Sequence, residues 1–237
     1  MANIIRWPAK LLVPARAMAS QVAFSRGGGK SLGGIERNIR TDRGFWRVSM
    51  TDVSVRTRAM RRVWNTIATD LAGKAGLVAV PVWAFDSAPY PSGEREREAL
   101  VTFDDDTGFD DDSAFIQGSI NVEMATYAPL GATVITVRLI NAAAAAGIRF
   151  SYQDALYQTG RVLAQPSETT FQVPVFPAIR QAIPAGAQLE CDAPTCLCHL
   201  SDDRGMDLPL NNTEIDVASV EFVEAVDYWN DLALGVA

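Results

Sequence analysis

One stretch of this 237-residue sequence clearly has the apolar spacing of an α-helix, and most of the rest has the pattern of β-strands. Apolar residues recur at intervals of three and four over residues 55–71, which places them on one helical stripe. Thr57 can cap the start of this helix, and Gly73 or Gly76 can end it. The pattern predicts a helix at about residues 57–73, packed onto a sheet through its apolar stripe.

The remaining regular segments are short and rich in β-branched and aromatic residues, which is typical of strands. The best alternation runs over residues 133–139, and Val217 to Val226 closes the chain as a last strand. Five alanines within residues 141–147 favour a loop or a single turn beside Gly147. Strands are also expected at residues 45–50, 77–83, 99–103, 114–117, 147–150, 155–163, 169–173, 188–191 and 195–200. The predicted fold class is mainly β (α+β), with β-sandwich or barrel-type domains and one packed helix.

Composition narrows the class of protein. The chain has no apolar run near the roughly 18 residues that a membrane-spanning helix needs, so we expect no membrane span. Three cysteines in 237 residues do not make a disulfide scaffold, and a single histidine argues against histidine-based catalysis.

The best internal break is at residues 89–93. It divides the chain into an N-terminal strand–helix–strand part, residues 1–90, and a β-rich part, residues 91–237.

The charges are unevenly distributed along the chain. Residues 1–76 carry 14 Lys or Arg and 4 Asp or Glu, whereas residues 77–237 carry 7 and 24. The net charges are therefore +10 and −17. The acidic part would repel a phosphate backbone, so we expect no nucleic-acid sequence recognition. Two readings remain: the basic face of one copy contacts the acidic face of another, or the charges segregate without consequence.

The first twenty residues resemble a signal peptide only in part. Pro14 and Arg16 interrupt the apolar run that such a signal needs. An organelle transit peptide is the alternative reading, because the first acidic residue is Glu36. We expect instead that this segment belongs to the mature protein in a reducing cytoplasm.

Three segments have the composition of a binding site but not its spacing. Gly27 to Ser31 resembles the end of a phosphate-binding loop, but Phe24 stands where the pattern needs glycine, so we expect a flexible glycine loop. The acidic loop from Asp104 to Asp112 has oxygen ligands that calcium favours, without EF-hand spacing. We expect a solvated hairpin tip there, and calcium or a paired-carboxylate hydrolase are the alternatives.

A cysteine-rich segment offers the remaining candidate metal ligands: Cys191, Cys196, Cys198 and His199. Zinc or an iron–sulfur cluster could use such ligands, although the spacing lacks the usual two-residue gap. In a strand, Cys196 and Cys198 share one face and His199 lies on the other. We expect buried free thiols, with a metal site or a Cys191–Cys196 disulfide as alternatives. No catalytic residue, cofactor site or metal site is therefore predicted, and His199 is the sole imidazole base.

Several segments, taken in order, resemble distal tail (Dit-like) proteins of long-tailed, siphovirus bacteriophages. Gly33 to Arg37 followed by Thr41 to Trp46 resembles a family pattern in which Gly-x-Glu precedes an Asp-x-Gly-x-Trp strand. The helix and residues 77–83 follow in the family's order. The repeated Phe-Asp over residues 103–115 resembles its Asp-Gly hairpin, with glycine only at Gly108. Residues 175–180, 185–186 and 192–194 resemble its Pro-x-Leu-Arg, Ala-Gly and Pro segment, and residues 220–225 its final strand.

The resemblance covers most of residues 26–226 and implies a virion structural protein of the phage tail tip. Such proteins form a closed ring, usually a hexamer, between the tail tube protein and the hub or baseplate. The implied location is the phage tail, assembled in the host cytoplasm, and the family pattern supplies no catalytic residues. The alternatives are a tail hub protein, a receptor- or carbohydrate-binding tip protein, or a tail-associated hydrolase. Some tail hub proteins hold iron–sulfur sites.

Overall fold

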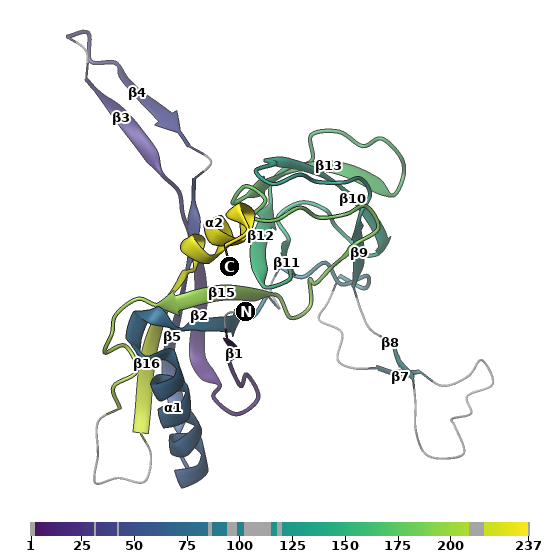
Figure 1. The fold of residues 1–237 in the computed structure, drawn as a ribbon. Coiled ribbons are helices and arrows are strands. Elements are labelled where there is room, and N and C mark those ends of the chain that lie inside the picture. The colour runs from purple at the N-terminus through teal and green to yellow at the C-terminus, as the bar shows by residue number, and fades with distance from the viewer. Residues whose placement is uncertain are drawn as a thin grey trace.

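The protein is mainly β, with a mixed sheet, a barrel and two hairpins that extend away from them (Figure 1). The computed structural model describes residues 3–30, 32–41, 43–84, 87–93, 99–101, 115–117, 120–208 and 216–236. A helix packs on the mixed sheet, so the predicted fold class is confirmed. No helix within these described ranges is long and apolar enough to span a membrane.

The mixed sheet has six strands in the order β1-β6-β15-β16-β5-β2. Their bounds are β1 (Ile4–Arg6), β6 (Leu77–Pro81), β15 (Thr195–Leu200), β16 (Asp216–Glu224), β5 (Phe45–Val55) and β2 (Pro14–Val22). β1 pairs with β6 in parallel, and the other neighbours are antiparallel. The sheet therefore combines strands from both ends of the chain.

The barrel is built from the central part of the chain. Its strands, in spatial order, are β11 (Arg149–Tyr152), β12 (Ala155–Thr159), β13 (Thr170–Phe176), β10 (Val134–Asn141), β9 (Asn121–Met124) and β14 (Gln188–Leu189). Ser151 and Glu190 exchange two backbone hydrogen bonds of 2.8 and 3.0 Å. This bridge brings β11 to the end of β14 and nearly closes the sheet on itself.

Helix α1 (Arg58–Leu71) lies within the predicted range of residues 57–73 and ends two residues before its predicted limit. The Oγ1 of Thr57 accepts the backbone N–H of Met60 at 3.2 Å, and a 3₁₀ turn, η1 (Gly73–Ala75), follows the helix. Ala72, rather than a glycine, takes the left-handed position at its end. Trp64 is fully buried and donates its Nε1–H to the carbonyl of Met206 at 2.8 Å. Met60 is half-buried against the same core, so the expected packing of the helix onto the sheet through its apolar stripe is confirmed.

Two cores meet along strand β15. Cys196 and Cys198 point into the core beneath α1, which we call the helix-side core, whereas Leu197 belongs to the barrel core. Neighbouring strand residues thus face opposite cores, as the strand period of two requires. Leu156 of the barrel reaches across into the helix-side core. The two parts of the body therefore interlock instead of meeting at a flat surface.

The end of the chain differs from the sequence prediction. Strand β16 stops at Glu224, and a second helix, α2 (Val226–Leu234), follows it. The prediction that a strand closes the chain at Val226 is therefore wrong. Trp229 explains the helix, because its side chain is buried in the barrel core and anchors α2 to the body.

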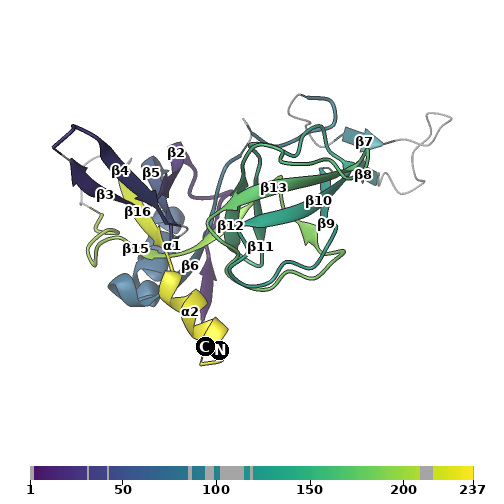
Figure 2. The ribbon, with the colours of Figure 1, turned by 90° about the horizontal axis from the view of Figure 1, so that it is seen from above.

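Two hairpins extend from the body in different directions (Figures 1 and 2). Strands β3 (Ser25–Lys30) and β4 (Glu36–Arg40) form the first, which we call the arm, residues 25–40. Strands β7 (Ala99–Val101) and β8 (Phe115–Gln117) form the second. Both views place the arm at one end of the molecule and β7–β8 at the other.

Candidate functional site

The structure does not bring the three cysteines together. Cys196 and Cys198 lie in the helix-side core, Cys191 lies in the barrel core, and all three are buried free thiols. Burial raises the pKa of the Cys191 thiol to about 12 and that of Cys196 well above its ordinary value. Both thiols are therefore protonated at neutral pH, which makes them poor nucleophiles.

His199 lies on the opposite face of β15 from the two core cysteines, as the alternation predicts. Its Nδ1 is 2.8 Å from the carbonyl oxygen of Gly76, and its Nε2 is 3.0 Å from Oδ1 of Asp227. The ring thus ties β15 to the start of α2. Within the described parts of the chain, no three His, Cys, Asp or Glu side chains are grouped so that they could hold a metal ion.

The other two sequence candidates have different outcomes. Gly27 to Lys30 belong to strand β3 and not to a flexible loop, so that prediction is wrong. Gly27 pairs with Asn38 of β4, and backbone pairing of this kind needs no side-chain pattern. The loop from Asp104 to Asp112 lies outside the described residues, so its hairpin and calcium alternatives stay predictions.

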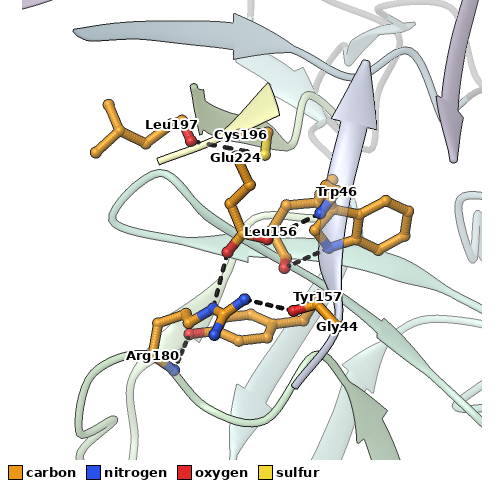
Figure 3. Close-up of polar contacts among 8 residues, drawn as sticks. All are labelled: Gly44, Trp46, Leu156, Tyr157, Arg180, Cys196, Leu197 and Glu224. Carbon is orange, nitrogen blue, oxygen red and sulfur yellow. Dashed lines mark hydrogen bonds and ion pairs between the residues drawn. The ribbon is translucent and has the colours of Figure 1, made fainter. Parts of the chain in front are cut away.

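A buried polar network joins the mixed sheet to the barrel (Figure 3). Arg180, which follows β13, donates from Nε to Oε1 of Glu224 at 2.8 Å and from Nη2 to the carbonyl of Gly44 at 2.7 Å. Its backbone N–H donates to the hydroxyl of Tyr157 at 2.9 Å. The second oxygen of Glu224 accepts the backbone N–H of Trp46 at 2.9 Å. We call these five residues the clamp.

The clamp is almost closed to solvent, which determines its electrostatics. The side chain of Arg180 is 13% exposed and that of Glu224 is 1% exposed. Burial raises the pKa of Glu224 above its ordinary value, while Arg180 and the N–H of Trp46 act in the opposite direction. Burial also raises the pKa of Tyr157, so its hydroxyl stays protonated. These groups satisfy one another, and the arrangement suits rigid attachment better than proton transfer.

Local sequence explains why the clamp can form at this point. A Cβ at Gly44 would lie 2.0 Å from the ring of Phe176, so the close approach requires glycine. Phe176 packs edge-on against Trp46, with ring centroids 5.9 Å apart. The indole Nε1–H of Trp46 donates to the carbonyl of Leu156 at 2.9 Å. The first residues of β5 are therefore fixed against the barrel, directly beside the base of the arm.

Whereas the clamp is buried, the arm is exposed to solvent. Its large apolar side chains are exposed to solvent within the chain: Leu32, Ile35 and Ile39, together with Phe24 at its base. The exposed fraction of Ile39 is 63% and that of Leu32 is complete. A two-stranded hairpin with no third layer is marginally stable in water. The arm should therefore gain stability when a partner covers its apolar side chains.

Comparison with known proteins adds no relative to this description. No protein-family model matches the chain, and no curated protein matches it either. The family resemblance therefore rests on the residues that carry it.

Proposed function

We propose that this chain is a ring-forming structural protein of a phage tail tip, a distal tail protein that joins the tail tube to the hub or baseplate. The observation that carries the proposal is the arm. Burying one exposed Leu or Ile side chain contributes roughly 1.5–3 kcal/mol, and the arm offers several outside the body. A subunit that reaches with such an arm onto a neighbouring copy gains this energy only on assembly.

The position of the arm suits a closed ring of identical copies. A cyclic ring needs two different, complementary surfaces on each subunit. The arm leaves one end of the molecule, while the barrel and β7–β8 occupy the other (Figure 2). The proposed partners are therefore further copies of this chain, the tail tube protein and the hub, within the virion tail after assembly in the host cytoplasm. Six copies is the number that the resemblance favours.

The clamp supports the family assignment. Gly44 and Trp46 come from the segment that resembles the Asp-x-Gly-x-Trp strand, Arg180 comes from the Pro-x-Leu-Arg segment, and Glu224 comes from the final strand. Three separate parts of the resemblance thus meet in one buried network. If the short motifs were alike by chance, their residues would have no reason to meet in one network. A shared architecture would bring them together.

The test compares assembly of the full chain with that of an arm variant. In the variant, residues 27–38 are replaced with Asn-Gly, a pair that closes a two-residue hairpin. Native mass spectrometry and electron microscopy of the purified protein should show closed rings for the natural sequence and monomers for the variant. The control is Leu163→Ser, which removes a half-exposed apolar side chain from the barrel instead of the arm.

The proposal also predicts where the protein lies in the phage. Reconstruction of intact tails should place copies of this chain in a ring around the tail axis. Rings that persist without the arm, or tails that contain no copy of this chain, would contradict the proposed role.

A further inference from the structure

A cleft of about 620 Å³ lies where the arm joins the body. Three parts of the chain line it: the base of the arm, the residue Arg180 of the clamp, and helix α2. The lining side chains that matter here are Phe24, Arg43, Phe45, Arg180, Val226 and Asn230. A partner that covers the base of the arm also meets this cleft, so the chemistry of the cleft helps to define that partner.

The cleft is basic with aromatic walls. Among the described residues that line it there are two guanidinium groups and no carboxylate. Glu224 neutralises Arg180 from behind, but Arg43 is exposed, and no hydrogen bond or ion pair engages it within the described part of the chain. The rings of Phe24 and Phe45 pack against each other with centroids 5.7 Å apart.

The acidic residues of α2 do not cancel this charge. Val226 and Asn230 are four residues apart and share the helix face that lines the cleft. Asp227 and Asp231 lie one position further round, and Asp227 contacts His199. The cleft therefore suits a negatively charged segment that also carries an aromatic or aliphatic side chain.

We propose that this cleft binds the acidic segment from Asp104 to Asp112 of a neighbouring copy. This inference rests on the proposed ring function and names the contact within it. The segment carries six aspartates within nine residues, with Phe109 between the two acidic triplets. Its charge complements Arg43, and its phenylalanine matches the aromatic wall. Complementary charge between surfaces directs both the register and the rate of association.

The geometry makes the contact intermolecular. Strands β7 and β8, which flank the acidic segment, lie at the opposite end of the molecule from the arm (Figures 1 and 2). A contact that joins opposite ends of identical subunits is head-to-tail, and it closes a ring when the rotation between copies permits. The segment and the cleft thus form the two unlike faces that such a ring requires.

A labelled peptide tests the contact directly. The probe is a peptide with the sequence of residues 102–114, and the receptor is the full chain with its six aspartates at 104–106 and 110–112 changed to asparagine. These changes remove competition from the receptor's own segments. Fluorescence anisotropy should show saturable binding that weakens as salt rises, since salt screens the charges. The same peptide with six asparagines should not bind.

Two matched receptor variants locate the site. Arg43→Gln in the cleft should weaken peptide binding about fivefold, the effect of one moderately exposed ion pair. Arg16→Gln removes the same charge from the same hairpin, but Arg16 pairs with Thr51, far along β2 from Phe45. It should leave binding unchanged.

The outcomes separate this inference from the proposed function. Absent peptide binding, or an equal loss in both arginine variants, overturns the proposed contact even where the natural chain forms rings. Peptide binding that requires Arg43, with a natural chain that forms no ring and is missing from tails, keeps the contact and rejects the ring function.

Discussion

The hairpin that runs from β2 to β5 has two halves with opposite surroundings. Its inner half pairs within the mixed sheet, and Trp46, Val48 and Met50 of β5 are fully or almost fully buried there. Its outer half is the arm, where Leu32 and Ile39 are exposed. The subunit's own core thus stabilises the inner half of the hairpin, whereas the described residues of the outer half have no contact with that core.

The two halves draw their stability from different sources. The inner half contributes to the free energy of unfolding of the single chain. The outer half should contribute to association, because its apolar area is buried only against a partner. Substitutions in the two halves should therefore change two different measurements. The four variants below, three on the hairpin and one at its clamp contact, test that division in order of their expected effect on unfolding.

The largest effect is expected for Trp46→Ala. The substitution removes a buried indole, its hydrogen bond to Leu156 and its contact with Phe176, so the free energy of unfolding should fall by about 4 kcal/mol. Thermal denaturation should show a melting temperature lower by about 10 °C. Met18→Ala on β2, where the side chain is 62% exposed, is the control. Equal melting temperatures for both variants would mean that the body does not hold this half of the hairpin.

The second effect is a charge imbalance in the clamp. Arg180→Met leaves Glu224 buried without its counter-charge and should cost about 3 kcal/mol in chemical denaturation, the lower end of the usual range because Arg180 is 13% exposed. Adding Glu224→Gln removes the uncompensated charge, so the double variant should be more stable than the sum of the single losses implies. Strict additivity would show that the two side chains do not act as a pair.

A smaller effect is expected at the junction of the two halves. Gly44→Ala places a methyl group against the ring of Phe176 and should cost about 1–3 kcal/mol through overpacking. Phe176→Leu in the same chain makes room for the methyl group. The double variant should therefore lose less than the two single losses together, as measured by denaturant unfolding. If the double variant loses as much as the two single variants together, the loss of stability does not come from the clash with Phe176.

The smallest effect on unfolding is expected in the arm. Leu32→Ser should change the free energy of unfolding by less than about 0.5 kcal/mol, because the side chain makes no contribution to the core. Sedimentation velocity should nevertheless show weaker assembly than for the natural chain. Leu163→Ser on the barrel should change neither quantity. An arm variant that melts early but assembles normally would reverse the division between the two halves.

Local patterns were sufficient to predict the parts of the fold that depend on local physics. The apolar stripe through Trp64 predicts α1 whatever surface the helix packs against. The alternation at residues 133–139 predicts β10 in the same way. The arm was missed because Gly27 to Gly29 have no side chains to alternate, and this part of the strand is made by backbone pairing alone. Helix α2 was missed because the strand pattern runs without a break into Val226.

The clamp could be predicted only in part. The alternation of β16 favours a buried Glu224, and the resemblance singles out Trp46 and Arg180, but nothing local pairs Arg180 with a glutamate 44 residues away. That pairing depends on how the barrel meets the mixed sheet. The separation of Cys191 from Cys196 and Cys198 has the same cause, since adjacent segments enter different cores.

The composition of the mixed sheet also bears on how the chain is made. β5 pairs with β2 soon after synthesis, but its other edge waits for β16, where Met50 pairs with Val220. Contacts between residues so distant in sequence slow folding and leave apolar strand edges exposed in the meantime. Trp46, Val48 and Met50 thus remain without their final partners until β16 has left the ribosome. The mixed sheet is therefore incomplete until β16 is available, and the period of greatest aggregation risk ends only when β16 enters the sheet.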